Sequence, residues 1–257
     1  MSNKSKKIVV ANWKMNPENE EAAKRIFLYT KKISKKIRKT DIIVCPPFVY
    51  LPLLSSFARK VSLGAQDVFW EENGSYTGEV SARMIKGVGA KYVIIGHSER
   101  RALGDSDEII NKKIKAALKT GLSVILCVGE KERDPHGAYL EFLSNQIHLS
   151  LGKVSKKEFS SIMVAYEPIW AIGAKSYKAI DGQELHETAL FIRKTLSDMY
   201  GYTEAMDTPI LYGGSVNAKN ANEILTEGGV QGFLVGRQSL EKELKDIIDI
   251  AESFKTI

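Results

Sequence analysis

The chain has few cysteines and no long apolar run, and each shortage excludes a class of protein. Cys45 and Cys127 are the 2 cysteines among 257 residues, and neither lies in a CxxC or Cys/His cluster with metal-ligand spacing. No apolar run reaches the roughly 20 residues that a membrane helix needs, and the first ten residues contain no signal core or cleavage site. We therefore expect reduced thiols, a cytoplasmic location and no contact with a membrane.

The sequence also lacks a linker, a low-complexity tract or a break in composition that would mark a second domain. Its apolar content of 44% and charged content of 26% are ordinary for a globular protein. We expect one domain that takes up residues 1–257.

Basic charge is unevenly distributed. The first 40 residues hold 12 Lys or Arg against 3 Glu, so the net charge of +6 comes from that segment. Much of it lies in KKISKKIRK, residues 31–39, where a lysine-rich helix face is usually solvated surface. We expect no nucleic-acid binding, although a basic field could draw in an anionic substrate.

Eight short apolar runs rich in Val, Ile and Leu recur along the chain, as expected of parallel strands covered on both faces. They are residues 8–13, 42–45, 61–65, 92–96, 123–128, 162–166, 209–212 and 232–235. Amphipathic helical patterns follow them at residues 19–38, 47–59, 81–88, 107–120, 139–151, 182–200, 218–227 and 240–254. This alternation predicts an α/β fold, a single-domain (β/α)8 barrel, with a doubly wound open sheet as the alternative. No GxGxxG follows the first strand.

One connection is unusually long for a compact domain. Residues 66–80, QDVFWEENGSYTGEV, contain Phe69, Trp70 and Tyr76 but no clear helix. Such loops are usually functional or docked on something, and exposed aromatic residues suggest a protein contact.

Polar residues follow several predicted strands, at the end of a barrel where active sites lie. The most informative is Glu167 in AYEPIWAIG, residues 165–173, because the loop behind it is apolar enough to form a water-excluding lid. The first strand ends in Asn12 and Lys14, and the fourth ends in His97, Ser98 and Glu99. The alternative for Glu167 alone is a buried strand end paired with a lysine.

Two glycine turns at the ends of the seventh and eighth predicted strands have the pattern of an anion site. YGGSVN, residues 212–217, and LVGRQSL, residues 234–240, each run from a strand through glycine to a predicted helix start. Free N–H groups and a positive helix dipole suit a phosphate there. The alternative is two tight turns with ordinary caps.

His97 directly precedes SERR, which places it at a predicted helix start. The helix dipole would disfavour its protonated form, so it could stay neutral and donate a hydrogen bond from one ring nitrogen. The alternative is a structural histidine.

Seven segments together resemble the triosephosphate isomerase family over nearly the whole chain. They are ANWKMN (11–16), the QDV to YTGE loop (66–79), YVIIGHSERR (92–101), CVGE (127–130), AYEPIWAIG (165–173), YGGSV (212–216) and GFLVG (232–236). The resemblance implies a cytosolic enzyme, an intramolecular oxidoreductase that interconverts D-glyceraldehyde 3-phosphate and dihydroxyacetone phosphate in glycolysis and gluconeogenesis. It implies no metal and no cofactor.

The resemblance also implies a role for each matching residue. Glu167 would remove a proton from the carbon beside the carbonyl, His97 would polarise the carbonyl oxygen, and Lys14 would stabilise the enediolate, with Asn12 orienting the oxygens. Glu99 and Ser98 would support them, whereas Cys127 and Glu130 would be structural. The phosphate clamp would consist of Gly173, Ser215, Gly236 and the backbone of Arg237.

A homodimer is implied as well, in which the loop from Gln66 to Glu79 docks into the partner subunit. Thr77 would then lie near Asn12 and Glu99 of the other subunit. The rival readings are another phosphosugar enzyme on the same barrel and a non-enzymatic phosphate-binding or surface-interaction protein.

The chain departs from the family pattern at four places. Ala174, Lys175 and Ser176 follow Gly173 where Thr-Gly-Lys is usual, and Arg237 and Gln238 follow Gly236 where a second glycine and a small residue are usual. Asp67 replaces an expected asparagine. Gln231 replaces an aspartate that pairs with an arginine, so that Arg193, if it is that arginine, needs another partner.

Overall fold

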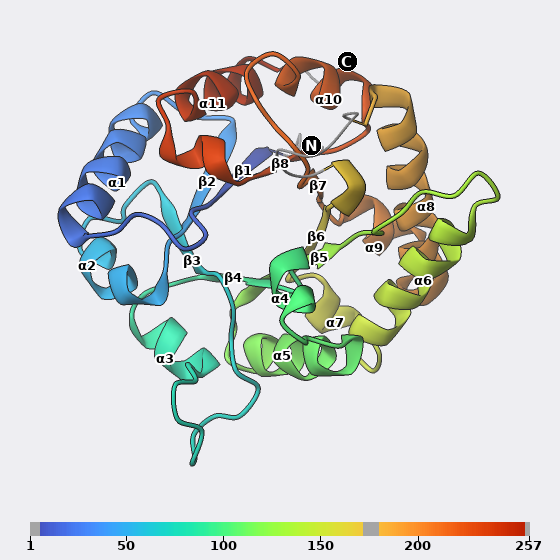
Figure 1. Cartoon of the computed structure of the whole chain (residues 1–257), viewed down its shortest axis with the longest axis horizontal. Helices are drawn as coiled ribbons and strands as arrows, with labels where there is room; N and C mark the ends of the chain where they lie inside the picture. Colours follow the sequence, from blue (N-terminus) through green and yellow to red (C-terminus); the bar gives the residue numbers. More distant parts are fainter. Residues whose placement is uncertain (1–5, 172–179, 255–257) are drawn as a thin grey trace.

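The computed structural model describes residues 6–171 and 180–254. Eight strands form its centre and helices surround them (Figure 1). The strands are β1 (Lys7–Asn12), β2 (Thr40–Cys45), β3 (Ser62–Ala65), β4 (Tyr92–Ile95), β5 (Ser123–Val128), β6 (Ile162–Tyr166), β7 (Ile210–Tyr212) and β8 (Gly232–Val235).

The sheet is a closed barrel, because every strand pairs in parallel with the next and β8 returns to β1. Closure is made by four residue pairs, from Ile8 with Gly232 to Ala11 with Val235. The prediction of a (β/α)8 barrel is confirmed, and the open-sheet alternative is wrong.

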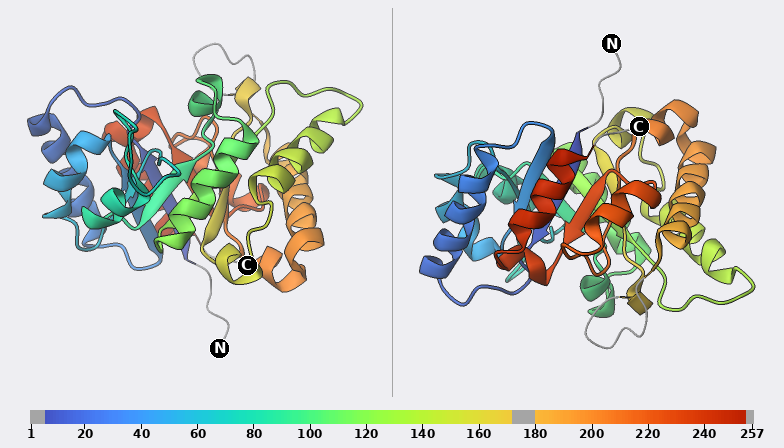
Figure 2. Two further views of the ribbon diagram at one scale, coloured as in Figure 1. Left: turned by 90° about the horizontal axis from the view of Figure 1, so that it is seen from below. Right: turned by 90° about the horizontal axis from the view of Figure 1, so that it is seen from above.

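Two apolar layers explain why the strands are apolar on both faces. Successive side chains of a strand point to opposite faces. Alternate residues such as Val10, Ile125 and Ala165 fill the barrel interior, while their neighbours such as Val9 and Val164 pack outward against the helices. Figure 2 shows the helices around the barrel from two sides.

The helices follow the predicted alternation with shifted ends and some additions. Those near predicted positions are α1 (Glu20–Ser34), α2 (Leu51–Ser55), α3 (Ala82–Gly87), α5 (Asp107–Lys119), α6 (Ala138–Ser150), α8 (Gly182–Tyr200), α10 (Ala221–Glu227) and α11 (Leu244–Ser253). Helix α4 (Ser98–Ala102) begins at the helix start predicted after His97, and the 3-10 turn η1 (Phe48–Tyr50) begins the helix predicted over residues 47–59. The 3-10 turn η3 (Arg237–Leu240) lies where a helix start was predicted after Gly236. Not predicted were α7 (Lys156–Phe159), α9 (Tyr202–Asp207) and the 3-10 turn η2 (Ile169–Ala171). These pieces are too short for a helical period to be read from the sequence.

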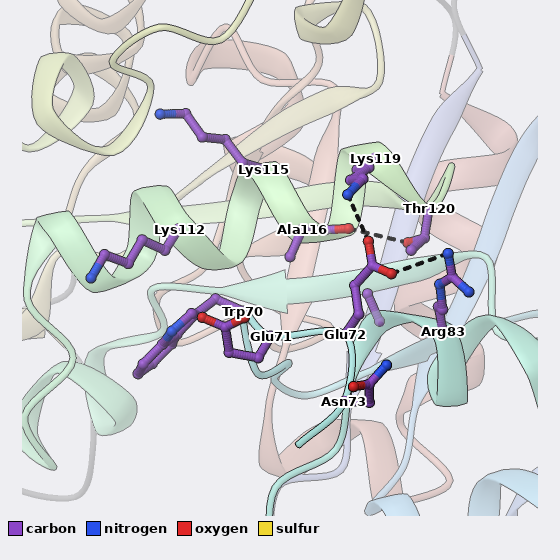
Figure 3. A pocket seen from close by; sticks show the side chains of 11 residues that line it. Trp70, Glu71, Glu72, Asn73, Arg83, Lys112, Lys115, Ala116, Lys119 and Thr120 are labelled. Atoms are coloured by element: carbon purple, nitrogen blue, oxygen red, sulfur yellow. Dashed lines mark hydrogen bonds and ion pairs between the residues drawn. The ribbon is translucent and has the colours of Figure 1, made fainter. Parts of the chain in front are cut away.

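The long loop between β3 and α3 extends from the rim of the barrel (Figure 1). Its root is tied to its own subunit, because Glu72 pairs with Lys119 of α5 at 2.6 Å and with Arg83 of α3 at 3.1 Å, as Figure 3 shows. Lys112 lies over the ring of Trp70 at 5.6 Å. These contacts border a hollow of about 580 Å³, and they join the loop to α3 and α5 of its own chain.

Gln231 and Asp67, which differ from the residues expected in the family, both bind other groups of the barrel. Gln231 Oε1 accepts from Arg193 Nη2 at 2.8 Å and from the Ile210 N–H at 2.8 Å, so the neutral amide replaces the expected aspartate. Burial lowers the pKa of Arg193. Asp67 accepts from buried Lys113 at 2.9 Å and pairs with Arg100 at 3.0 Å, contacts in which a carboxylate is favoured over an amide.

The basic segment lies at the wrong end of the barrel to attract a substrate. Residues 31–39 close α1 and lead into β2, so they lie at the amino ends of the strands. The active-site end is one strand length away, about 20 Å at 3.3 Å per residue, whereas salt screens charges beyond about 8 Å. We therefore expect this segment to contribute little to drawing in an anionic substrate.

No helix within residues 6–171 and 180–254 is long and apolar enough to cross a membrane.

Candidate active site

A cavity of about 290 Å³ opens at the carboxyl ends of the strands. Its lining comes from five strand ends, far apart in the chain. The lining residues are Asn12, Lys14, His97, Ser98, Glu167, Gly213, Gly214, Ser215, Val216, Asn217, Leu234, Gly236, Arg237 and Gln238. The structure thus brings together most of the residues singled out in the sequence.

Strand alternation aims several of these residues inward. Val10, Ala165 and Leu234 point into the barrel, and Asn12, Glu167 and Gly236 each lie two positions later, on the same face. When a strand continues in the same conformation beyond its last paired residue, its next inward-facing residue lies at the mouth of the barrel.

His97 reaches the mouth by a different route. Ile94 points inward and Ile95 outward, so simple alternation would turn His97 outward. Gly96 has φ of +78°, a left-handed conformation that glycine adopts at little cost, and it ends the strand. The turn makes His97 the N-cap of α4.

Glu167 and His97 bind each other directly. Glu167 Oε1 lies 3.1 Å from His97 Nε2, and Oε2 accepts from the Ser98 N–H at 3.0 Å. His97 Nδ1 accepts from the Glu99 N–H at 3.2 Å. That bond leaves the ring proton on Nε2, so His97 is neutral and donates to Glu167.

Lys14 is held at the mouth by three contacts. Its φ is +53°, a strained value for a residue with a side chain, which persists only where the surroundings impose it. Its N–H donates to Asn12 Oδ1 at 3.0 Å, its carbonyl accepts from Gln66 Nε2 at 2.8 Å, and its ammonium pairs with Glu99 Oε1 at 2.6 Å. Gln66 had not been singled out as a site residue, although it begins a segment quoted for the family.

The turns after β7 and β8 border the other half of the cavity. Ser215 Oγ donates to the Ala171 carbonyl at 3.2 Å, and Ser239 Oγ donates to the Asn12 carbonyl at 3.3 Å. The expected helix starts are corrected here. Asn217 and Asn220 exchange hydrogen bonds between backbone N–H and side-chain oxygen in a turn, and α10 begins only at Ala221. After Gly236 the chain forms the 3-10 turn η3, and α11 begins only at Leu244.

The root of the predicted lid is anchored by Glu130. Its Oε1 accepts from Tyr166 at 2.8 Å and from Trp170 Nε1 at 2.7 Å. Burial raises the pKa of Glu130. Residues 172–179, which include Gly173 and the Ala174-Lys175-Ser176 segment, lie outside the described residues, so the role expected of Gly173 stays a prediction.

The remaining residues that the sequence singled out lie apart from the cavity lining. Cys127 is buried in the barrel interior, where burial raises its pKa well above the usual range for a thiol. Thr77 is exposed in the long loop. Glu99 borders a second hollow of about 340 Å³ beside the first, together with Asn12, Lys14 and His97. No cluster of His, Cys, Asp and Glu within the described ranges could hold a metal ion.

Comparison with known proteins identifies the family. A profile described as Triosephosphate isomerase matches residues 7–253. The chain is similar over most of its length to three proteins named "Triosephosphate isomerase". The protein from Thermoanaerobacter pseudethanolicus is 41% identical over 91% of this chain and 94% of its own length. Those from Dehalococcoides mccartyi strain 195 and Dictyoglomus thermophilum are 44% identical over 92% of this chain and 93% of their protein, and 41% identical over 93% and 96%, respectively. With its closed barrel and its cavity at the strand ends, the chain belongs to the triosephosphate isomerase family.

Proposed function

We propose that this chain interconverts D-glyceraldehyde 3-phosphate and dihydroxyacetone phosphate by proton transfer through an enediolate, on one barrel domain of residues 1–257. The reaction is an aldose–ketose isomerisation and serves glycolysis and gluconeogenesis in the cytoplasm. The observation that supports it best is the direct contact of a carboxylate with a neutral imidazole, 3.1 Å from Glu167 Oε1 to His97 Nε2.

Glu167 is the general base. Glu167 is 2% exposed, and its carboxylate accepts from His97 Nε2–H and from the Ser98 N–H. A substrate carbonyl oxygen that takes over the His97 donor frees one carboxylate oxygen to accept a proton from the adjacent carbon.

His97 polarises that carbonyl and moves a proton between the two oxygens of the enediol. Its Nδ1 is occupied by the Glu99 N–H, which keeps the reactive proton on Nε2. Lys14 supplies positive charge for the developing enediolate, and the Asn12 side chain, which already holds the Lys14 N–H, orients the oxygens. Ser98 and Glu99 support this set through their contacts with Glu167 and Lys14.

The phosphate is held in the half of the cavity that the β7 and β8 turns border. The N–H groups of Gly214 and Ser215 have no acceptor among the described residues, so they are available to an anion. Gly236 and the backbone of Arg237 line the same cavity and donate to the same phosphate, and Gly173 completes the clamp.

The chain acts as a homodimer through the Gln66 to Glu79 loop. The hollow of about 340 Å³ beside the site is open, and Met15 (95% exposed) and Leu103 (77% exposed) lie at its edge. A partner's loop, which carries Thr77, fills that hollow and excludes water from Asn12 and Glu99. Sedimentation of the wild type and of Tyr76→Asp checks this: we expect a dimer and a monomer, and a monomeric wild type would refute it.

Turnover of glyceraldehyde 3-phosphate by the purified chain tests the function. Glu167→Ala should lower kcat by about 10²-fold or more, the scale of removing a general base. Glu132→Ala, which removes an exposed glutamate from the loop after β5, is the matched control and should match the wild type. Equal rates for wild type and Glu167→Ala would overturn the mechanism.

A further inference from the structure

Three charged residues line the active-site cavity, and two of them already contact other residues of the site. The lining includes Lys14, Glu167 and Arg237. Lys14 pairs with Glu99 at 2.6 Å, and Glu167 accepts hydrogen bonds from His97 and Ser98. Arg237 forms no ion pair or side-chain hydrogen bond within residues 6–171 and 180–254. Among the charged lining residues of the described structure, Arg237 is thus the one whose charge has no counterpart.

The backbone that carries Arg237 is fixed in place. Arg237 begins η3 directly after Gly236, and the Ser239 N–H donates to the Gly236 carbonyl at 2.8 Å. Ser239 Oγ ties the same turn to the end of β1. A methyl group on Gly236 would lie 3.3 Å from Lys14 Cε, so the turn packs against the Lys14 side chain. Arg237 therefore projects from a rigid rim, while its own side chain is exposed.

Arg237 belongs to the part of the cavity lining that otherwise offers only neutral groups. Gly213, Gly214, Ser215 and Gly236 contribute no formal charge there. A guanidinium stays protonated at any working pH and can donate two parallel hydrogen bonds to one phosphate. A phosphate monoester carries a charge of about −1.5 to −2 at pH 7, so it matches this half of the cavity in charge.

We propose that the Arg237 guanidinium binds the phosphate group of the substrate directly and makes the site selective for dianionic ligands. This inference rests on the proposed function for the identity of the substrate. It assigns the side chain a specificity-determining role, in addition to the clamp role of its backbone N–H. The glycine that the family resemblance leads one to expect at this position could supply the N–H but no charge.

Three variants distinguish the effect of the Arg237 side chain on binding from the effects of its backbone and of net charge. Arg237→Gly removes the guanidinium, and Arg237→Lys keeps a charge without the two-donor geometry. Lys242→Ala removes one exposed positive charge that does not line the cavity and is the matched control. Binding of inorganic phosphate, measured by calorimetry without turnover, and steady-state kinetics with glyceraldehyde 3-phosphate are the readouts.

We expect Arg237→Gly to raise the dissociation constant of phosphate and the KM by about tenfold, the scale of losing a charge-assisted hydrogen bond. Arg237→Lys should recover part of that loss, and Lys242→Ala should equal the wild type. The difference between wild type and Arg237→Gly should shrink as salt is raised, because an exposed charge is screened. Thermal unfolding of each variant shows that it is folded.

Wild-type phosphate affinity in Arg237→Gly, or an equal loss in Lys242→Ala, would overturn the proposal. A change confined to kcat would also overturn it, because a binding contact made equally to substrate and transition state acts on KM. If phosphate binding depends on Arg237 but the chain shows no isomerase turnover, the proposed function is refuted while the side-chain contact is still supported.

Discussion

Gly213→Ala tests how closely the catalytic carboxylate is fitted to the barrel. A Cβ at Gly213 would lie 2.8 Å from Glu167 Cγ, about 0.6 Å short of the 3.4 Å at which ordinary contact begins. Glu167 is held from the other side by Ser98 and His97, so it must shift or lose those bonds. Because a misplacement of about 1 Å can cost roughly 10²-fold in rate, we expect kcat to fall about tenfold or more.

The assay is steady-state turnover of glyceraldehyde 3-phosphate with thermal unfolding of the same samples. Gly213 lies outside the left-handed region of φ, so alanine should be tolerated by the backbone and the melting temperature should change little. Gly87→Ala is the matched control, because a Cβ there would meet nothing within 4 Å. Wild-type kcat in folded Gly213→Ala would refute the reasoning, and so would an equal loss in Gly87→Ala.

Three further predictions follow from described contacts. Gln231→Ala should lower the free energy of unfolding by about 2 kcal/mol, because buried donors lose their acceptor, whereas Gln231→Glu should keep both bonds to Arg193 and Ile210 and match the wild type; urea unfolding distinguishes them. The raised pKa of Glu130 means that its protonated form stabilises the fold. Its contribution to the free energy of unfolding is present below about pH 4.3 and is lost as pH rises through the raised pKa. Glu130→Gln should flatten that part of the stability–pH curve, and an unchanged curve would refute this. Replacing Lys35 and Lys36 with Gln should leave kcat/KM unchanged at low and high salt, and a salt-dependent loss would show that the basic segment does steer the substrate.

The strands could be predicted because their signal is local. Each is a continuous apolar run, so all eight predicted runs overlap the observed strands. The same alternation that fills the barrel interior carries Asn12 and Glu167 to the mouth, so these residues could be found by counting from the strand.

What could not be predicted depends on contacts between distant segments or on backbone conformation. The left-handed conformation of Gly96, which turns His97 toward the cavity, has no periodic signal in the sequence. The bond from Gln66 to the Lys14 carbonyl joins residues 52 positions apart, and the close approach of Gly213 to Glu167 joins two strands. The acceptor role of Gln231 was missed because an amide replaced the expected carboxylate.

The pairing of β8 with β1 has a consequence for the growing polypeptide. Ile8, Val9, Val10 and Ala11 are made first, yet their partners Gly232 to Val235 are made more than 220 residues later. Until then one edge of β1 exposes unpaired N–H and C=O groups, the kind of edge on which chains aggregate. The nascent sheet therefore remains open for nearly the whole of synthesis, and a ribosome stalled before residue 232 would hold an apolar strand edge that another chain can pair with.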